Sequence, residues 1–203
     1  MRSVLCGAAV LAAAGSLAHA DFLTNGNFEA GNTGFSSDYE YSAANVSPYI
    51  GQYGITQSSF AWTSFWGTVP GDHTTGTGNF LIADGGPNLS AAIWRQTVSI
   101  PANTPMTLTG WLATWTSFPA NSLRVVVNGN AVATWNAPAG GTWTPYSASW
   151  TSDASGSATI ALIPSVYFQP GADVAIDDLV LVPGPASLSV AALALVGAAR
   201  RRR

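Results

Sequence analysis

The stretch Leu123–Trp135, LRVVVNGNAVATW, decides the fold class of this chain. Its apolar residues up to Val127 recur at every second position, which places their side chains on one face of a strand. Asn128-Gly129-Asn130 follows directly, and Asn-Gly readily adopts the positive φ angles of a tight hairpin turn. The chain then returns over Ala131–Trp135. The stretch therefore predicts an antiparallel β-hairpin.

The same alternation recurs along the chain, and no segment shows the 3.6-residue apolar period of a three-turn helix. We expect further strands over Asn79–Asp84, Ile93–Ile100, Met106–Trp115, Trp143–Trp150, Ser157–Ile163 and Ala172–Val182. Residues 36–78 are the least regular part, and there we expect loops. Many short strands joined by Gly, Pro and Asn turns are typical of an antiparallel β-sandwich or jelly roll, so the predicted fold class is all-β.

The N-terminus has the features of a secretion signal. Arg2 precedes an apolar stretch, Val4–Leu17, and Ala18-His19-Ala20 is the small-x-small pattern that signal peptidase accepts. We expect cleavage after Ala20 and a mature domain over residues 21–182. Cys6 is the only cysteine of the chain and lies in the removed segment. We therefore expect neither a disulfide nor a thiolate metal site.

The expected mature domain is strongly acidic. It holds all ten acidic residues of the chain against two cations, Arg95 and Arg124, which gives a formal charge of −8. Nucleic acid and anionic lipid need clustered cations, so we expect neither as a partner. With 47% hydrophobic residues, the chain is too apolar for intrinsic disorder.

The C-terminus, residues 183–203, has the features of a membrane stop. Val182-Pro183-Gly184-Pro185 precedes an uncharged apolar run, Ala186–Ala199, and Arg200, Arg201, Arg202 and Arg203 end the chain. Four arginines do not cross the hydrocarbon and remain on the cytoplasmic side. As a helix, the run spans about 21 Å of a hydrocarbon core of roughly 30 Å, which suits transient arrest better than permanent anchoring.

This tail resembles the PEP-CTERM sorting tails of bacteria, which an exosortase (a membrane cysteine transpeptidase) recognises and cleaves. The resemblance implies a Gram-negative-type host, arrest in the inner membrane, and processing near Pro183, Gly184 and Pro185. It also implies a place at the cell surface or in the extracellular polysaccharide matrix. Gly184 stands where the family usually has Glu. An ordinary tail anchor or a disordered basic end is the alternative.

The two ends of the mature domain resemble a second family. An opening phrase, Asn25-Gly26-Asn27-Phe28-Glu29, and a closing phrase, Ile176-Asp177-Asp178-Leu179, are similar to those of the galactose-binding-like jelly rolls. That superfamily includes carbohydrate-binding modules of bacterial glycanases. The resemblance implies the fold, whereas the ligand depends on the site.

The same resemblance implies a structural calcium ion, which binds six to eight oxygen ligands. Carried over to this sequence, Glu29 and Asp177 supply carboxylates, and Asn27 and Gly78 supply backbone carbonyls. Because side chains alternate along a strand, we expect Asp177 and Asp178 on opposite faces, with one of them toward solvent. The alternative is that Glu29 caps a turn and the two aspartates make backbone hydrogen bonds.

Four tryptophans are candidate glycan-binding residues: Trp62, Trp66, Trp111 and Trp115. Sugar rings stack their apolar C–H faces on aromatic rings, and their hydroxyls bind nearby amides and carboxylates. Trp111 and Trp115 share one face of an expected strand, and the other two lie in the irregular region. The alternative is that these indoles fill the core.

Catalysis is not expected. His73 is the one histidine of the expected mature domain and lies in a turn, so a serine nucleophile has no other imidazole base. The spacing of the acidic residues does not favour a glycosidase pair. The sequence thus predicts a non-enzymatic surface or matrix β-sandwich protein, associated with glycans. A carbohydrate-binding module with a defined polysaccharide ligand is the alternative, and a glycanase is the less favoured third.

Overall fold

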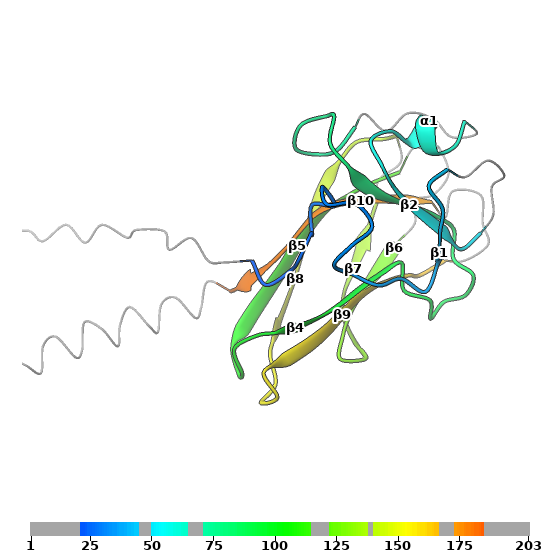
Figure 1. Ribbon diagram of the computed structural model, residues 1–203. Helices are drawn as coiled ribbons and strands as arrows, with labels where there is room; N and C mark the ends of the chain where they lie inside the picture. Colours follow the sequence, from blue (N-terminus) through cyan, green and yellow to red (C-terminus); the bar gives the residue numbers. More distant parts are fainter. Residues whose placement is uncertain are drawn as a thin grey trace, which may run out of the picture.

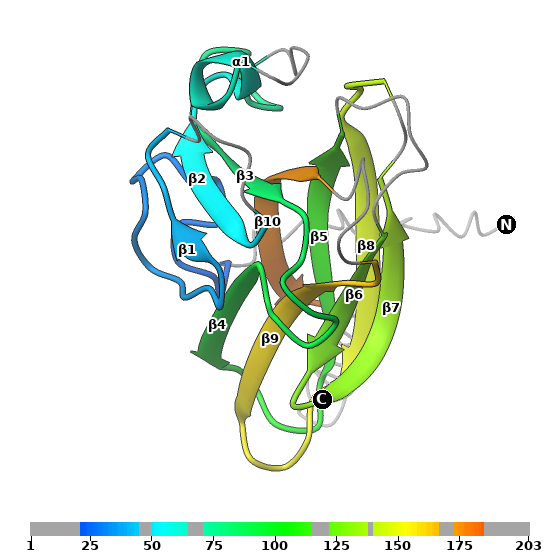
Figure 2. The ribbon, with the colours of Figure 1, turned by 90° about the vertical axis from the view of Figure 1, so that its right-hand side faces the viewer.

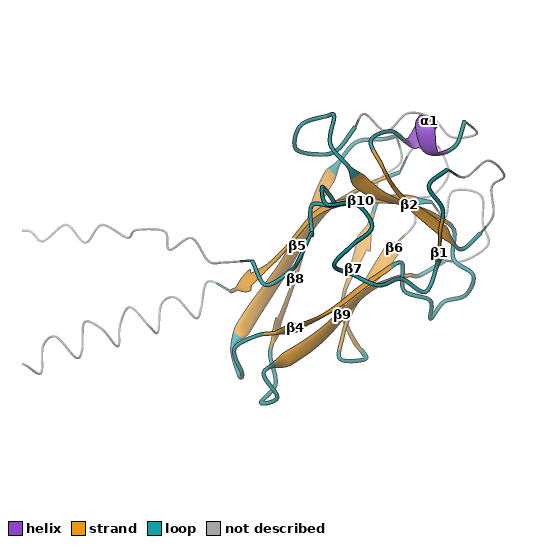
Figure 3. Ribbon diagram, in the orientation of Figure 1, coloured by secondary structure: helices purple, strands orange, loops and turns teal. Residues whose placement is uncertain are grey.

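A computed structural model describes residues 21–44, 50–64, 71–114, 122–137, 140–166 and 173–184 of the 203-residue chain. Over these residues two β-sheets pack face to face, and one short helix, α1 (Ser59–Trp62), lies at one end (Figures 1 and 2). Figure 3 shows that strands and their connecting loops make up nearly all of the rest. The predicted all-β sandwich is confirmed.

The larger sheet has six strands in the order β1-β2-β3-β10-β5-β8. They are β1 (Glu40–Tyr41), β2 (Gln52–Thr56), β3 (Phe80–Asp84), β10 (Val174–Pro183), β5 (Pro105–Ala113) and β8 (Thr144–Thr151). Neighbours are antiparallel except β1 and β2, which are parallel. The last strand of the sandwich therefore lies in the middle of this sheet, between β3 and β5.

The smaller sheet has four strands in the order β4-β9-β6-β7. They are β4 (Trp94–Ser99), β9 (Ser157–Pro164), β6 (Ser122–Val127) and β7 (Asn130–Asn136). The hairpin expected from the sequence is β6–β7. At its turn Asn128 and Gly129 have φ angles of 48° and 82°, the left-handed conformation that a tight hairpin requires.

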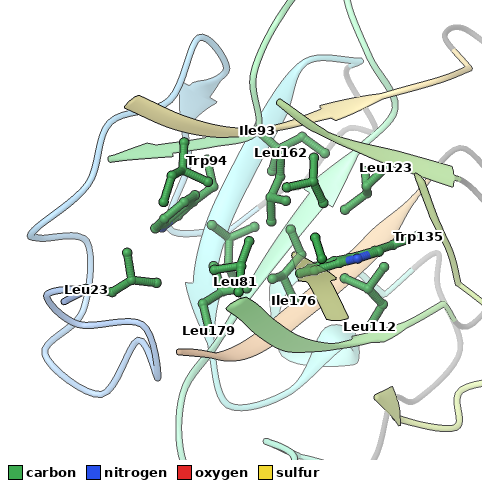
Figure 4. Close-up of a cluster of buried hydrophobic side chains, with 14 of the residues drawn as sticks. Leu23, Leu81, Ile93, Trp94, Leu112, Leu123, Trp135, Leu162, Ile176 and Leu179 are labelled. Atoms are coloured by element: carbon green, nitrogen blue, oxygen red, sulfur yellow. The ribbon is translucent and has the colours of Figure 1, made fainter. Parts of the chain in front are cut away.

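The main core fills the space between the sheets. Figure 4 shows Leu81, Leu112 and Ile176 of the larger sheet together with Leu123, Trp135 and Leu162 of the smaller one, all of them buried. Gly110 of β5 lies in this layer for a steric reason, because a Cβ there would be 2.5 Å from Leu179 Cδ2. Side chains along β5 thus alternate between a buried face that meets the core and an outer face that is only partly buried.

A second, smaller apolar cluster covers part of the outer face of the six-stranded sheet. It consists of Trp62, Phe80, Ile82, Ala113 and Ala175, with Trp143 packed against it. Trp62 of α1 is 1% exposed, and its indole N–H donates to the Ser42 carbonyl at 2.8 Å. The prediction of Trp62 as a stacking residue is therefore wrong, because its ring packs on the sheet and does not face solvent.

Residues 36–78 are more regular than expected, since they contain β1, β2 and α1. The sequence of β2, QYGIT, does not show the alternation of side chains that predicts a strand, because Gly54 occupies an outward-facing position and has no side chain. A Cβ on Gly54 would lie 2.3 Å from Trp62 Nε1. The close packing of α1 on β2 thus requires glycine at position 54, and this glycine is the reason that the strand was not predicted.

Candidate functional site

Polar and aromatic side chains gather on the outer face of the six-stranded sheet, where loop 71–78 lies over β5 and β10. Trp111 of β5 is half-buried, and across the sheet it has Asp177 of β10 on one side and Pro145 of β8 on the other. His73 of the loop stacks on Trp111, with ring centroids 3.6 Å apart and an interplanar angle of 18°. The loop and the strand thus form one aromatic platform, Trp111 with His73.

Two carboxylates of β10 hold His73 in this position. The backbone N–H of His73 donates to Asp177 Oδ2 at 2.8 Å, and its Nδ1 lies 2.7 Å from Asp178 Oδ2. The Thr74 hydroxyl also donates to Asp178. The sequence predicted that these aspartates lie on opposite faces, with one toward solvent. Asp177 is 1% exposed and the Asp178 side chain is 24% exposed, but both carboxylates bind the same loop. A register shift between Asp177 and Val180, with Asp178 at a φ of 47°, turns both carboxylates toward the loop.

Asp72 organises the loop from within. It accepts hydrogen bonds from the backbone N–H groups of Thr74, Thr75 and Gly78, and from the Thr75 hydroxyl. Burial by itself raises the pKa of Asp72, but the bonds from Thr75 and Gly78 outweigh it and lower the pKa to about 2. The loop is therefore built around an ionised carboxylate at neutral pH.

Glu29 reaches the same loop from the N-terminal segment. Its Oε1 accepts the backbone N–H of Asn79 at 2.9 Å. A Cβ on Gly78 would lie 2.2 Å from that oxygen, so only glycine at this position lets the carboxylate approach so closely. Asn27 precedes it, and the backbone N–H of Glu29 donates to Asn27 Oδ1 at 3.5 Å. The sequence left open whether Glu29 caps a turn. The structure contains such a contact, because the Glu29 carboxylate accepts the backbone N–H of Asn79.

Asp177 is the most enclosed of these acids, at 1% exposure. Burial raises its pKa to about 7, and the charges of Asp178 and Asp72 act in the same direction. Beside Asp178 and Asn27, between the N-terminal segment and β10, lies a cavity of about 330 Å³ whose wall also includes Asp21.

The four predicted calcium ligands therefore lie around one loop and the strand beneath it. Among the described residues no three His, Cys, Asp or Glu side chains are close enough to hold a metal ion by themselves. A cation here depends on backbone carbonyls in addition to Glu29 and Asp177, as the resemblance implies. The donors fit calcium, because they are oxygens and because a buried carboxylate with a raised pKa gains stability from a nearby cation.

Several predicted positions lie outside the described residues: Trp66, Trp115, Ala20, Pro185, Arg200, Arg201, Arg202 and Arg203. Pro183 ends β10, opposite Met106, and the Gly184 N–H donates to the Pro105 carbonyl at 2.8 Å. Over the described ranges no helix is long and apolar enough to span a membrane.

One acidic pair was missed by the sequence analysis. Val174 pairs with Ala83, which places Asp173 opposite Asp84 at the adjoining end of β10 and β3. Both are buried, and burial together with the hydrogen bond to Asp84 raises the pKa of Asp173 well above its usual value. Only the pairing of distant strands brings the two carboxyls together, so no local spacing signals them.

Comparisons with known proteins identify the fold. No protein-family model matches the chain, and no curated protein matches it either. The CBM22-1 xylan-binding domain of Paenibacillus barcinonensis Xyn10C is 13% identical, with a TM-score of 0.56 over 82% of this chain and 96% of that one. The module TmCBM61, solved with β-1,4-galactotriose, is 15% identical, with a TM-score of 0.55 over 81% and 99%.

The same fold also occurs in an enzyme. A cyclase from Fischerella sp. TAU is 14% identical, with a TM-score of 0.54 over 80% of this chain and 96% of that one. At such identities the likeness extends to the fold alone. This chain therefore has the β-sandwich fold that carbohydrate-binding modules and this cyclase share.

Proposed function

We propose that this protein is an exported, non-enzymatic β-sandwich that binds a glycan on the outer face of its six-stranded sheet. The observation that carries the proposal is the half-buried Trp111, stacked with His73, whose Nδ1 lies 2.7 Å from the carboxylate of Asp178. Aromatic rings beside fixed polar groups are the usual means of holding a sugar, whose C–H faces are apolar and whose edges carry hydroxyls.

The sheet next to this platform is open and rich in hydroxyls. Thr107 and Thr109 of β5 pair with Ser149 and Ser147 of β8, and all four are at least partly exposed. The hydroxyls of Thr107 and Ser149 lie 3.1 Å apart. We call these four residues the hydroxyl face. Its direction along β5, leading away from Trp111, suits a glycan chain longer than one sugar.

A neutral glycan is favoured over an anionic one. The expected mature domain has a formal charge of −8, and one of its two cations, Arg95, is paired with Asp38 at 2.7 Å. An anionic polysaccharide would need cations that this face does not offer among the described residues. Two structural neighbours, a xylan-binding domain and a module solved with a galactotriose, support a neutral polysaccharide as the ligand class.

The lack of catalysis is also part of the proposal. Asp173 hydrogen-bonds to Asp84, so these two carboxyls are closer than the roughly 5–9.5 Å that separates the acids of glycosidases. Because a cyclase shares the fold, every binding experiment should include a product analysis, and we expect the glycan to be recovered unchanged.

We propose in addition that Glu29, Asp177 and the carbonyls of Asn27 and Gly78 hold a structural calcium ion. When bound, calcium would supply positive charge to the buried Asp177.

We further propose that residues 1–20 direct export through signal peptidase and that residues 183–203 arrest the chain in the inner membrane for an exosortase-like transpeptidase. After this processing the protein would be located at the cell surface or in the extracellular polysaccharide matrix.

Removing the platform ring tests the binding proposal. We expect Trp111→Ala to lower retention on insoluble xylan and galactan about five- to 150-fold, because a stacked ring contributes on the order of 1–3 kcal/mol. Trp111→Phe should retain part of the binding. Depletion assays at a fixed protein concentration measure the effect.

The matched control is Tyr41→Ala, which removes a 44%-exposed ring from β1, at the far edge of the same sheet. Equal losses in Tyr41→Ala and Trp111→Ala, or unchanged retention of Trp111→Ala, would contradict the proposal. Thermal unfolding of each variant separates loss of binding from loss of fold.

A further inference from the structure

His73 of the platform has one ring nitrogen that the protein leaves unused. Its backbone N–H donates to Asp177 and its Nδ1 lies 2.7 Å from Asp178 Oδ2, whereas Nε2 has no hydrogen-bond partner among the described residues. The His73 side chain is 25% exposed, and Nε2 is not one of the buried polar atoms that lack a partner. A group from outside the protein can therefore reach Nε2.

Contacts on its other sides hold the imidazole in one orientation. One ring face stacks on Trp111, and the ring of Trp143 lies 6.5 Å away at an interplanar angle of 77°. The backbone bond to Asp177 and the contact of Nδ1 with Asp178 fix the base of the side chain and its inner edge. Because the ring is already fixed in the folded protein, binding at Nε2 costs little further side-chain entropy.

Asp178 decides which of the two ring nitrogens carries the proton. A carboxylate accepts hydrogen bonds, so Nδ1 is the donor, and Nε2 of the neutral imidazole then has the free lone pair. Asp178 is itself fixed, since its φ of 47° turns it toward the loop and the Thr74 hydroxyl donates to it. Asp178 thus presents Nε2 to solvent as a hydrogen-bond acceptor.

Two other uses of such a nitrogen do not fit its surroundings. A general base that activates a protein nucleophile contacts that nucleophile, and Nε2 has no such contact in the part of the chain that the structure describes. A transition metal ion would need further imidazoles or thiolates, and His73 is the only His or Cys in the described ranges. A hydrogen-bond donor on a bound ligand is the remaining partner.

We infer that His73 Nε2 accepts a hydrogen bond from a hydroxyl of the glycan that stacks at Trp111, and that Asp178 is the residue that positions it. The inference rests on the proposed function and narrows its ligand class. The glycan must carry an unsubstituted hydroxyl beside the sugar ring that contacts Trp111. A glycan whose hydroxyls are all O-methylated has no donor there and should bind weakly.

The ring nitrogens of the ¹⁵N-labelled full chain at pH 8 test the inference directly. The two resonances of His73 are assigned by their loss in His73→Phe. We expect one resonance of an N–H nitrogen and one of a nitrogen with a lone pair, because Asp178 fixes the tautomer. Titration with β-1,4-galactotriose or with xylotetraose should shift the lone-pair resonance saturably in at least one case. Asp178→Asn should mix the two tautomers, because an amide donates as well as accepts.

Retention on insoluble xylan and galactan gives a second readout. His73→Phe keeps an aromatic ring beside Trp111 and removes the nitrogen, so we expect retention to fall about two- to twelvefold, the effect of one lost hydrogen bond. Asp153→Asn is the matched control for Asp178→Asn, since Asp153 lies on the turn between β8 and β9. It should leave retention and both His73 resonances unchanged. Thermal unfolding of each variant shows whether it is folded.

The inference is overturned if neither oligosaccharide moves the lone-pair resonance, or if His73→Phe is retained as strongly as the unmodified chain. In both cases a retention that depends on Trp111 still supports the proposed function. If retention does not depend on Trp111, the proposed function is refuted, and this inference with it.

Discussion

Asp84 and Asp173 face each other from neighbouring strands, and their burial prevents both from being ionised together. The raised pKa of Asp173 has burial as its main cause, followed by the hydrogen bond to Asp84 and the negative charge of that residue. Tyr39 responds to the same charge, since burial and Asp84 both raise its pKa. The pair is thus a proton-sharing site inside the folded protein.

The pair predicts that stability falls as pH rises. The pKa of an aspartate in the unfolded chain is about 3.9. A carboxyl whose pKa is higher in the folded protein stabilises the fold fully below pH 3.9, and this stabilisation is lost as pH rises through the folded pKa. In EDTA, we expect the melting temperature to fall by roughly 5–10 °C between pH 5 and pH 8. Asp173→Asn, which mimics the protonated acid, should reduce this dependence and leave only the share of Asp177, whose raised pKa of about 7 acts in the same direction.

Asp72 does not interfere with this measurement. Its folded pKa is lowered to about 2, so its contribution is present above its unfolded pKa and is lost only as pH falls toward 2. Asp153→Asn serves as a control, because Asp153 is an acid on a surface turn whose pKa is lowered by Ser155. A slope that is the same in Asp173→Asn as in the unmodified chain would show that the pair is not its source.

At the scale of elements, loop 71–78 joins parts of the chain that are far apart in sequence. Glu29 contacts it from the N-terminal segment, and Asp177 and Asp178 contact it from β10. The sequence indicated Glu29, Asp177, Asn27 and Gly78 through the two phrases and a glycine before a strand. It did not indicate that His73 and Asp72 belong to the same site, because Gly71-Asp72-His73-Thr74 looks like an ordinary turn.

This arrangement predicts a calcium effect on unfolding. Saturating calcium, at about 100 times its dissociation constant, should stabilise the fold by about 2.7 kcal/mol and raise the melting temperature by roughly 5–10 °C over an EDTA-treated sample. Glu29→Gln and Asp177→Asn should each remove most of that increase.

Glu40→Gln is the control, since Glu40 is exposed on β1. Magnesium should have little effect, because it is smaller and keeps its waters. A calcium response that persists in Glu29→Gln would contradict this ligand assignment.

At the scale of the whole molecule, the proposed export and sorting can be read from the mass of the chain. We expect protein recovered outside the cells to begin at Asp21 and to end near Pro183–Pro185, because a transpeptidase would cut ahead of the apolar run. Intact-mass spectrometry of membrane and released fractions measures both ends. Material that begins at Asp21 and still ends at Arg203 in every fraction would indicate an ordinary tail anchor instead.

The sequence by itself determined the class of fold and most of its strands. Alternation of apolar residues and the Asn-Gly turn are local signals, and β5, β6, β7 and β10 follow them closely because side-chain period and turn chemistry depend only on neighbouring residues. Strand β2 escaped detection, since its central Gly54 accommodates Trp62, a contact that exists only in the folded chain.

Only the tertiary structure decided which residues form sites. It buried Trp62 against the sheet and left Trp111 half-exposed under His73, although the sequence offered both as candidate stacking residues. It also bulged β10 so that Asp177 and Asp178 face one loop. The reason is physical: exposure, pKa and cavity shape depend on strand order and on contacts between distant segments, and local periodicity carries no information about either.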